Sequence, residues 1–407
     1  MICWSNFGFM FRSFLNCFKN EPPVRVAVDL THLVGGGLNG GIKPFVFEFL
    51  QWIAKARGRE FIFIYFTKSS LVAEVEAFRR DVDWQVCVGE SDGVSLPVSG
   101  QRQGLVAAPG DTAGWRRRWP ADVLYTPLGY SEFRQAGLPW ITLIVDTLHR
   151  DVPDGLTVPA VAFRETWIRD GVVSADAVQC ISHFAAGQLQ RYYGADAAKL
   201  FVTHCVVRER LRAEDGSASA PKRPGAPPYF FYPANDWPHK NHPALLEAYA
   251  EYRREAGAKA WDLVLSGHFT QPEVGGERIA ALGLAGSCRI LGHIGVVEFA
   301  EVFRSAGALV FPSLYEGFGI PVLEAMAFGV PVACSREGSL PEVAGEAALF
   351  FDARRPEDIA RALREISQDA GLRERLIAAG KRRAADFVVS REAGRLADRF
   401  VALGRLR

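Results

Sequence analysis

Residues 311–332 decide the fold of this chain and read FPSLYEGFGIPVLEAMAFGVPV. The apolar run 308–311 predicts a buried strand, which Pro312 breaks. After Pro321 apolar residues recur at helical spacing, and proline suits the first turn of a helix. The stretch therefore predicts a strand, a loop with glycines and a helix, which is the repeating unit of an α/β sheet.

Two glutamates occupy this unit, Glu316 in the loop and Glu324 on the helix. Ligands of an open α/β sheet bind in the crevice beyond the carboxyl ends of its strands, so we expect both carboxylates to face that crevice. A solvated surface is the plainer explanation for two glutamates, but the Gly-Phe-Gly-Ile-Pro segment between them is too apolar for a merely solvated loop. A glycoside hydrolase that uses the two carboxylates as a catalytic pair is one alternative.

Composition limits the class of protein. The 407 residues, 49% of them hydrophobic, are sufficient for two domains with sizeable cores. A formal net charge of +1 gives no drive toward nucleic acid. The 7 cysteines are dispersed without a C-x-x-C pair, which indicates reduced thiols in the cytoplasm and neither disulfides nor a zinc site. No apolar run approaches the ~20 residues of a membrane span.

Two aromatic segments raise the question of membrane contact. Within residues 1–20 aromatic side chains recur at helical spacing, which predicts an amphipathic helix that could lie at the inner membrane surface. A helix packed on its own domain, or a start codon assigned too early, explains this segment equally well. Residues 115–119 read WRRRW, a pattern that suits anionic headgroups, although a solvated loop is the plainer explanation.

The first half of the chain predicts a phosphate-binding unit. A strand at 24–30 precedes a glycine-rich loop at 31–41 and a helix at about 44–56, so free N–H groups and the helix dipole converge on the loop. The loop contains a literal G-x-G-x-x-G, but the second strand ends in Thr67-Lys68 without the acid that a dinucleotide needs, which argues against a nicotinamide-dependent dehydrogenase.

Polar residues follow further predicted strands. Asp81-Val-Asp83 matches a metal-binding D-x-D formally, but its position predicts a structural turn, so we expect no metal there. Asp146 and His149 come directly after the strand at 141–145, which places them at the crevice. Lys240 stands just before a predicted helix, where its charge adds to the positive end of the helix dipole.

The stretch at 311–332 resembles the Glu-x7-Glu signature of the family 4 retaining glycosyltransferases. The similarity continues through Gly-Val-Pro-Val and then Pro-Glu-Val-Ala-Gly at 341–345. It implies the GT-B fold, in which two Rossmann-like, doubly wound α/β domains face one another across a central cleft. The expected divisions are an amphipathic helix at 1–20, an acceptor-side domain at 21–208, a linker at 209–228, a nucleotide-sugar domain at 229–384, and a last helix at about 385–407 that packs back on the first domain.

The resemblance implies transfer of a sugar from a nucleotide-sugar, such as GDP-mannose or another GDP- or UDP-sugar, without metal or other cofactor. The acceptor would be a glycan or a lipid-linked glycan of surface polysaccharide biosynthesis. Glu316 would hold the sugar, Lys240 the diphosphate and Glu324 the ribose. The catalytic residues implied are Glu316, Lys240, Asp146 and His149. The donor-binding residues implied are Gly40, Gly41, His239, Lys240, His293, Ile294, Glu316, Gly317, Phe318, Gly319, Ile320 and Glu324.

The chain departs from the family pattern in two places. Val145 stands where the family often has a histidine, and Ala234 and Asn235 stand where it commonly has an arginine that binds the diphosphate. These departures keep a third possibility open, an inactive sugar-nucleotide-binding or scaffold protein.

Overall fold

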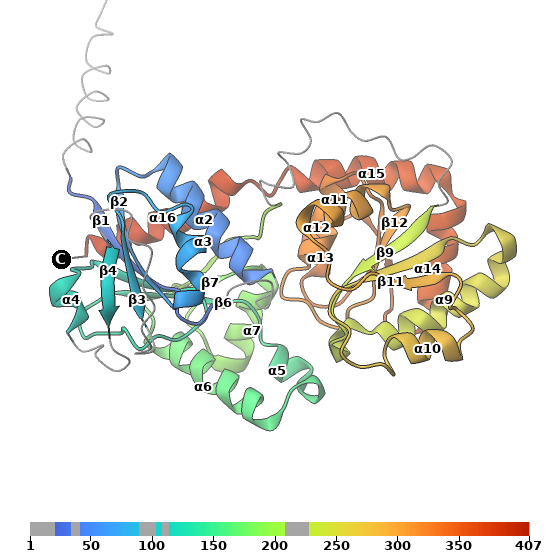
Figure 1. The fold of residues 1–407 in the computed structure, drawn as a ribbon, viewed down its shortest axis with the longest axis horizontal. Helices are drawn as coiled ribbons and strands as arrows, with labels where there is room; N and C mark the ends of the chain where they lie inside the picture. Colours follow the sequence, from blue (N-terminus) through green and yellow to red (C-terminus); the bar gives the residue numbers. More distant parts are fainter. Residues whose placement is uncertain (1–20, 34–40, 89–102, 108–113, 208–227, 407) are drawn as a thin grey trace, which may run out of the picture.

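The computed structural model describes residues 21–33, 41–88, 103–107, 114–207 and 228–406. They form two α/β domains that lie side by side (Figure 1). The predicted helix at 1–20, Gly40 and all but the last residue of the predicted linker at 209–228 lie outside the described residues.

The first domain is built on a parallel sheet with the order β4-β3-β2-β1-β5-β6-β7-β8. Its central strands are almost continuously apolar, as in Phe-Ile-Phe-Ile-Tyr-Phe-Thr of β2, because helices cover both faces of a parallel sheet. The strands are β1 (Val24–Asp29), β2 (Phe61–Thr67), β3 (Trp84–Val88), β4 (Gln103–Ala107), β5 (Val123–Thr126), β6 (Trp140–Ile144), β7 (Ala177–Cys180) and β8 (Leu200–Val202).

Side-chain caps begin two of the helices of this domain. Thr157 caps α6 and Ser182 caps α7 with its side chain, and α7 stops at Gly194 in the left-handed conformation. Helix α6 extends below the sheet in Figure 1. The helices are α2 (Ile42–Ala56), α3 (Val72–Glu76), α4 (Trp115–Arg118), α5 (Leu148–Asp151), α6 (Val158–Ser174) and α7 (His183–Tyr193), with a 3₁₀ turn η2 (Pro153–Gly155) between α5 and α6.

The second domain has a parallel sheet with the order β11-β10-β9-β12-β13-β14. Numbered within the domain this is 3-2-1-4-5-6, the order of a dinucleotide-binding fold, and the chain reverses direction across the sheet between β9 and β12. The strands are β9 (Tyr229–Pro233), β10 (Asp262–Ser266), β11 (Cys288–Ile290), β12 (Ala308–Phe311), β13 (Val332–Ser335) and β14 (Ala348–Phe351).

Helices again follow the strands of the second domain. Helix α14 buries one apolar side, including Ile359, Leu363 and Ile366, and packs against α9. The helices are the 3₁₀ turn η4 (Pro238–Lys240), α9 (His242–Ala256), α10 (Gly276–Ala281), α11 (Val296–Ser305), α12 (Ile320–Ala327), α13 (Leu340–Ala344), α14 (Pro356–Gln368) and α15 (Ala370–Ala384).

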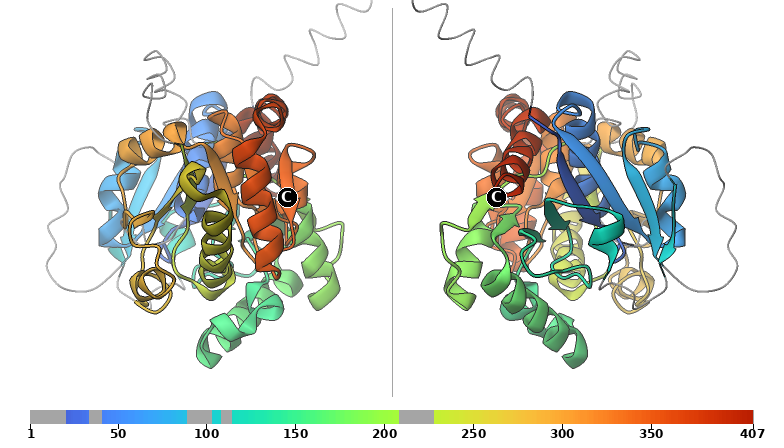
Figure 2. Two further views of the ribbon diagram at one scale, coloured as in Figure 1. Left: turned by 90° about the vertical axis from the view of Figure 1, so that its right-hand side faces the viewer. Right: turned by 90° about the vertical axis from the view of Figure 1, so that its left-hand side faces the viewer.

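The last helix, α16 (Val389–Gly404), belongs to the first domain in space. It packs against α2 and β1, and Figure 2 shows it in dark red beside the blue strands of that domain. Phe400 is fully buried and its ring meets those of Phe61, Phe63 and Tyr125. The chain therefore crosses between the domains twice.

Residues 103–107 form the edge strand β4 of the first sheet. Another short segment differs from the expectation stated for it. The WRRRW segment is a short helix and not a solvated loop, because Trp115 and Trp119 are buried in the core, where their rings contact that of Phe66.

Candidate active site

The candidate site lies where the second sheet reverses direction. Lys240 ends η4, which follows β9, and Glu316 lies in the loop after β12, so the two come from the strands on either side of that point. Lys240 Nζ and Glu316 Oε1 are 2.6 Å apart, and both side chains are largely buried, at 14% and 11% exposure. In open α/β sheets such a point is where ligands bind.

Backbone geometry fixes Lys240. Asn241 is the only residue other than glycine with a positive φ, 60°, among the described residues. Asparagine tolerates this conformation, and its Nδ2 donates to the carbonyl oxygens of Pro312, at 3.2 Å, and Ala353, at 2.7 Å. The hydroxyl of Tyr232 donates to the Lys240 carbonyl at 2.6 Å. The lysine is therefore tied to the start of the Glu316 loop.

The Glu316 loop is held from both domains. Ser339 donates to the Glu316 carbonyl through its backbone N–H and its hydroxyl, at 3.1 and 3.0 Å. From the first domain, Ser182 Oγ donates to the Gly317 carbonyl at 2.8 Å. A Cβ on Gly317 would lie 2.7 Å from the carbonyl oxygen of Val145, so only glycine permits this approach.

The start of α12 brings the predicted donor residues of both domains together. Gly319 has a φ of +92°, and a Cβ there would meet Leu340 at 2.5 Å. A Cβ on Gly41, in the first domain, would lie 2.6 Å from Ile320 Cδ1, so the glycine loop meets the helix start. Glu324, one turn further on, is 1% exposed. Its carboxylate is therefore buried in this structure, and the expectation that it faces the crevice stays a prediction.

The residues after β6 separate into two environments. Asp146 lies at the domain junction: its Cβ is 3.2 Å from a Cβ built on Gly317, and its Oδ1 accepts from Leu148 N at 3.0 Å and lies 3.3 Å from Arg164 Nη1. His149 is instead 2% exposed, with Nε2 2.9 Å from the Tyr193 hydroxyl, at the carboxyl end of α7.

The two residues that contact His149 Nε2, Tyr193 and Glu165, belong to its own domain, and its Nδ1 is buried without a hydrogen-bond partner among the described residues. Its catalytic role stays a prediction. Burial is the main cause that lowers its pKa, and a hydrogen bond with Glu165 opposes this only in part.

The positions around the missing arginine have structural roles. Asn235 Oδ1 accepts from His268 N at 2.9 Å, and Asp236 Oδ2 accepts from Gln271 N at 2.8 Å, so both shape the turn after β10. His239 is 8% exposed. Burial lowers its pKa to about 3, with smaller contributions from the charges of Lys240 and Arg164. His239 is therefore neutral at physiological pH and supplies no positive charge.

His293 and Ile294, which the resemblance implies as donor-binding residues, follow β11 in the second sheet. The rings of His268, after β10, and His293, after β11, are stacked 4.9 Å apart at an interplanar angle of 10°. Both side chains are exposed, and Ile294 beside them is half-buried. Flat exposed rings at this edge could stack on a base. The sequence predicted His293 here but gave no sign of its partner His268.

An interdomain clamp joins the second domain to the start of α7. We define it as the Glu342 carboxylate, the backbone N–H groups of His183 and Phe184, and the His204 ring. Glu342 accepts from His183 N at 2.8 Å and Phe184 N at 2.9 Å, and it bonds His204 Nε2 at 2.9 Å. Thus a carboxylate of one domain caps a helix of the other.

The side chains of His183, His204 and Glu342 are the one group of potential metal ligands among the residues that the structure describes. Both oxygens of Glu342 already accept hydrogen bonds from the clamp. We therefore treat the group as a structural contact.

The Pro-Glu-Val-Ala-Gly sequence at 341–345 contains Glu342, but no local pattern in the sequence indicates that its carboxylate meets the start of α7.

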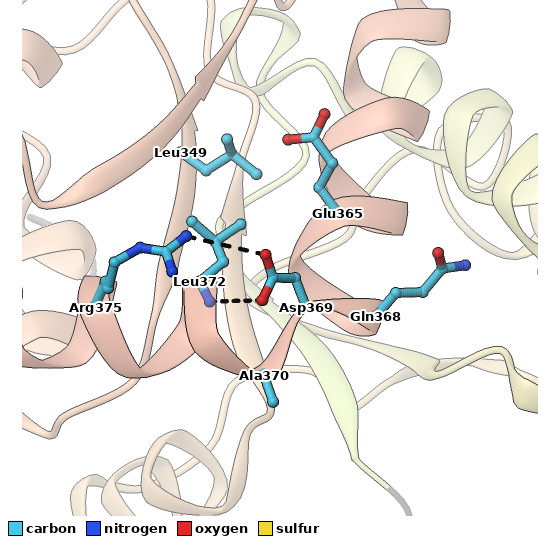
Figure 3. A pocket seen from close by; sticks show the side chains of 7 residues that line it. All are labelled: Leu349, Glu365, Gln368, Asp369, Ala370, Leu372 and Arg375. Atoms are coloured by element: carbon cyan, nitrogen blue, oxygen red, sulfur yellow. Dashed lines mark hydrogen bonds and ion pairs between the residues drawn. The ribbon is translucent and has the colours of Figure 1, made fainter.

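A separate hollow lies between α14 and α15 (Figure 3). Asp369 in this hollow caps α15 by accepting from Leu372 N at 2.8 Å, and Arg375 lies near it. None of the predicted site residues lines it. Its polar groups serve the helix start, and we assign it no ligand.

Comparison with known families supports a sugar-transfer site. Residues 217–383 match the family model described as glycosyl transferases group 1. The chain is 30% identical over 232 residues to the O-antigen chain mannosyltransferase B of Escherichia coli. This match covers 56% of this chain and 61% of that protein, which is less than two thirds of its length. It is 28% identical over 401 residues to a D-inositol 3-phosphate glycosyltransferase of Streptomyces avermitilis, covering 91% of this chain and 85% of that protein.

Solved structures share the fold. The sucrose-phosphate synthase of Thermosynechococcus elongatus superposes with a TM-score of 0.68 at 18% identity, over 93% of this chain and 99% of that one. Anabaena HepE in complex with UDP and glucose superposes with a TM-score of 0.65 at 14% identity, over 93% of this chain and 100% of that one. Among the described helices, we find none with the length and apolar character needed to cross a membrane.

Proposed function

We propose that this chain, whose residues 217–383 match the group 1 glycosyl transferases and which has the GT-B fold, transfers a sugar from a nucleoside diphosphate sugar to an acceptor hydroxyl with retention of the anomeric configuration. The observation that carries the proposal is the Lys240–Glu316 pair, at 2.6 Å, where the second sheet reverses direction. One ammonium and one carboxylate at a nucleotide-binding edge suit the two halves of such a donor.

Lys240 would neutralise the departing diphosphate. The bond between the anomeric carbon and the phosphate oxygen breaks, the acceptor oxygen bonds to the same carbon, and the acceptor proton passes to a phosphate oxygen. The ammonium would bind the diphosphate of the donor, and it would also offset the negative charge that grows on the leaving group. Amides near Gly41 and at the start of α12 would add to this, and we propose that no metal is needed.

Glu316 would bind the sugar and stabilise the positive charge that develops at the anomeric carbon. The loop is fixed on both sides by Ser339 and Ser182, so the carboxylate needs little reorganisation during the reaction. Glu324 is 1% exposed in this structure, which is less than a ribose ligand requires. We propose that it binds the ribose hydroxyls of the donor after a movement of α12.

The relatives suggest two identities for the donor base and sugar, and both are proposals. The similarity to a mannosyltransferase favours a GDP-sugar, and the neighbour solved with UDP favours a UDP-sugar. The acceptor would be a glycan or lipid-linked glycan of surface polysaccharide synthesis, used in the cytoplasm or at the inner face of the membrane.

Titration calorimetry with UDP and GDP tests this function, followed by turnover of a panel of UDP- and GDP-sugars. We expect one nucleotide to bind at micromolar to low millimolar concentration and its sugar to be consumed. If neither nucleotide binds at millimolar concentration, the proposal fails and a scaffold role becomes the better explanation. Release of free sugar from a glycan without any nucleotide would instead support a hydrolase.

A further inference from the structure

The donor site lacks a second positive charge within the second domain at the positions expected to supply it. Lys240 is already paired with Glu316. Asn235 replaces the expected arginine, and its side chain holds the backbone of His268. His239 is buried and its pKa is lowered to about 3, so it is neutral. A diphosphate group carries more negative charge than Lys240 alone can neutralise, because that lysine already pairs with Glu316.

An arginine of the first domain lies against the Glu316 loop. Arg164, on α6, has Nη1 3.3 Å from Asp146 Oδ1, and its side chain is 32% exposed. Asp146 in turn lies beside Gly317, with 3.2 Å between its Cβ and a Cβ built on that glycine. The guanidinium is therefore anchored by the residue that contacts the sugar-binding loop.

The same segment also touches the lysine turn. A Cβ built on Gly155, in η2 just before α6, would lie 3.6 Å from the ring of Pro238, in η4. Lys240 and Arg164 are the two cations whose charges lower the pKa of His239, in addition to its burial. The charge of Arg164 thus acts on the lysine turn, and its partner Asp146 lies against the Glu316 loop.

We propose that Arg164 is the second phosphate-binding cation of the donor site, supplied by the first domain across the cleft. A guanidinium has five N–H donors, so it can hold a phosphate oxygen while it still contacts Asp146. This inference rests on the proposed function for the presence of a diphosphate ligand. It makes the donor site complete only when the domains are closed.

Calorimetric titration of the full chain with UDP, GDP, UMP and GMP tests the proposal. For Arg164→Ala and the uncharged, polar Arg164→Gln we expect diphosphate affinity to fall roughly 10- to 100-fold, the range for hydrogen bonds to charged groups, and monophosphate affinity to fall less. Arg169→Ala is the matched control, because Arg169 lies on the same helix, is 57% exposed and pairs only with Glu165 among its ion-pair partners in the described residues. We expect it to stay within about twofold of the unmodified chain.

A rescue variant makes the test specific. Adding Asn235→Arg to Arg164→Ala returns a cation to the site from the second domain, and we expect it to recover most of the lost diphosphate affinity. Wild-type affinity in both Arg164 variants would overturn the inference while leaving the proposed function intact. Equal losses for mono- and diphosphates would also overturn it, since a phosphate-binding cation must favour the diphosphate. Failure of the unmodified chain to bind any nucleotide defeats the inference together with the proposed function.

Discussion

At the scale of single residues, the Lys240–Glu316 pair is the feature on which the function depends. The two side chains are within hydrogen-bond distance and largely buried, so each determines the electrostatic environment of the other. The loss of one partner leaves an uncompensated charge in the site, and the effects of the two substitutions should not add.

Glu316→Gln and Lys240→Ala should separate catalysis from donor binding. We expect Glu316→Gln to lower kcat by about 10²–10³-fold, because the charge opposite the anomeric carbon is lost. Lys240→Ala should mainly raise KM for the donor, by roughly tenfold or more. Steady-state kinetics on the identified donor, with circular dichroism to verify folding, checks both. Glu357→Gln, whose 55% exposed side chain pairs with Arg355 at the start of α14, is the control. Activity at the wild-type level in both variants would show that Lys240 and Glu316 do not form the active site.

The D-x-D at residues 81–83 gives a second prediction at this scale. Asp83 is fully buried, accepts from Phe63 N at 2.9 Å and pairs with Arg80. Asp83→Ala should lower the free energy of unfolding by about 3–5 kcal/mol, because Arg80 loses its buried partner. Asp81→Ala, on the exposed side of the turn, should change little. Chemical denaturation measures both, and activity lost in both variants without loss of stability would indicate a functional site instead.

At the scale of secondary-structure elements, the interdomain clamp links α13 of one domain to α7 of the other. Burial by itself lowers the pKa of His204, but hydrogen bonds with Glu342 and Glu392 outweigh burial and raise it. The pKa of Glu342 is lowered despite its own burial, by His204 and by the N–H groups of α7. The charged forms of the two side chains therefore stabilise one another.

The clamp should weaken as pH rises. Because the pKa of His204 is higher in the closed protein, its contribution is fully present below its ordinary pKa of 6.5 and is lost as pH rises through the raised value. Hydrogen exchange of the His183 and Phe184 amides, corrected for intrinsic rate, should therefore be faster at pH 9 than at pH 6. We expect His204→Gln to remove this dependence. His183→Ala should retain it, since the clamp uses only the backbone of His183. An unchanged pH profile in His204→Gln would contradict the role of His204.

At the scale of the whole molecule, the chain finishes the first domain with its last helix. Phe400 on α16 fills the space between the rings of Phe61, Phe63 and Tyr125. The crossing after α15 and the clamp both restrict how the domains can separate. Closure of such a cleft excludes the water that would otherwise hydrolyse the donor.

Phe400→Ala should destabilise the first domain. Removing a fully buried phenylalanine costs about 3–5 kcal/mol. We expect an earlier unfolding transition in denaturant and increased hydrogen exchange in β1 and β2, with nucleotide binding to the second domain less affected. Leu406→Ala, at a position 70% exposed, is the control. A stability unchanged by Phe400→Ala would show that α16 is not part of the first core.

The sequence by itself determined the fold class and the family. Apolar runs broken by proline and glycine predict buried parallel strands, and the 311–332 stretch predicts the loop that carries Glu316, because these patterns depend on local periodicity and turn chemistry. The position of Lys240 before a helix was also readable, since η4 and the start of α9 are local features.

Only the tertiary structure decided which side chains meet. It placed Lys240 against Glu316 across 76 residues of sequence, buried Glu324 and turned His149 toward Tyr193. It also set Arg164 beside Asp146 at the domain junction. An exposed arginine on a helix has no local signature of function. Contacts between domains depend on how two finished surfaces fit together, and no pattern within one segment specifies that fit.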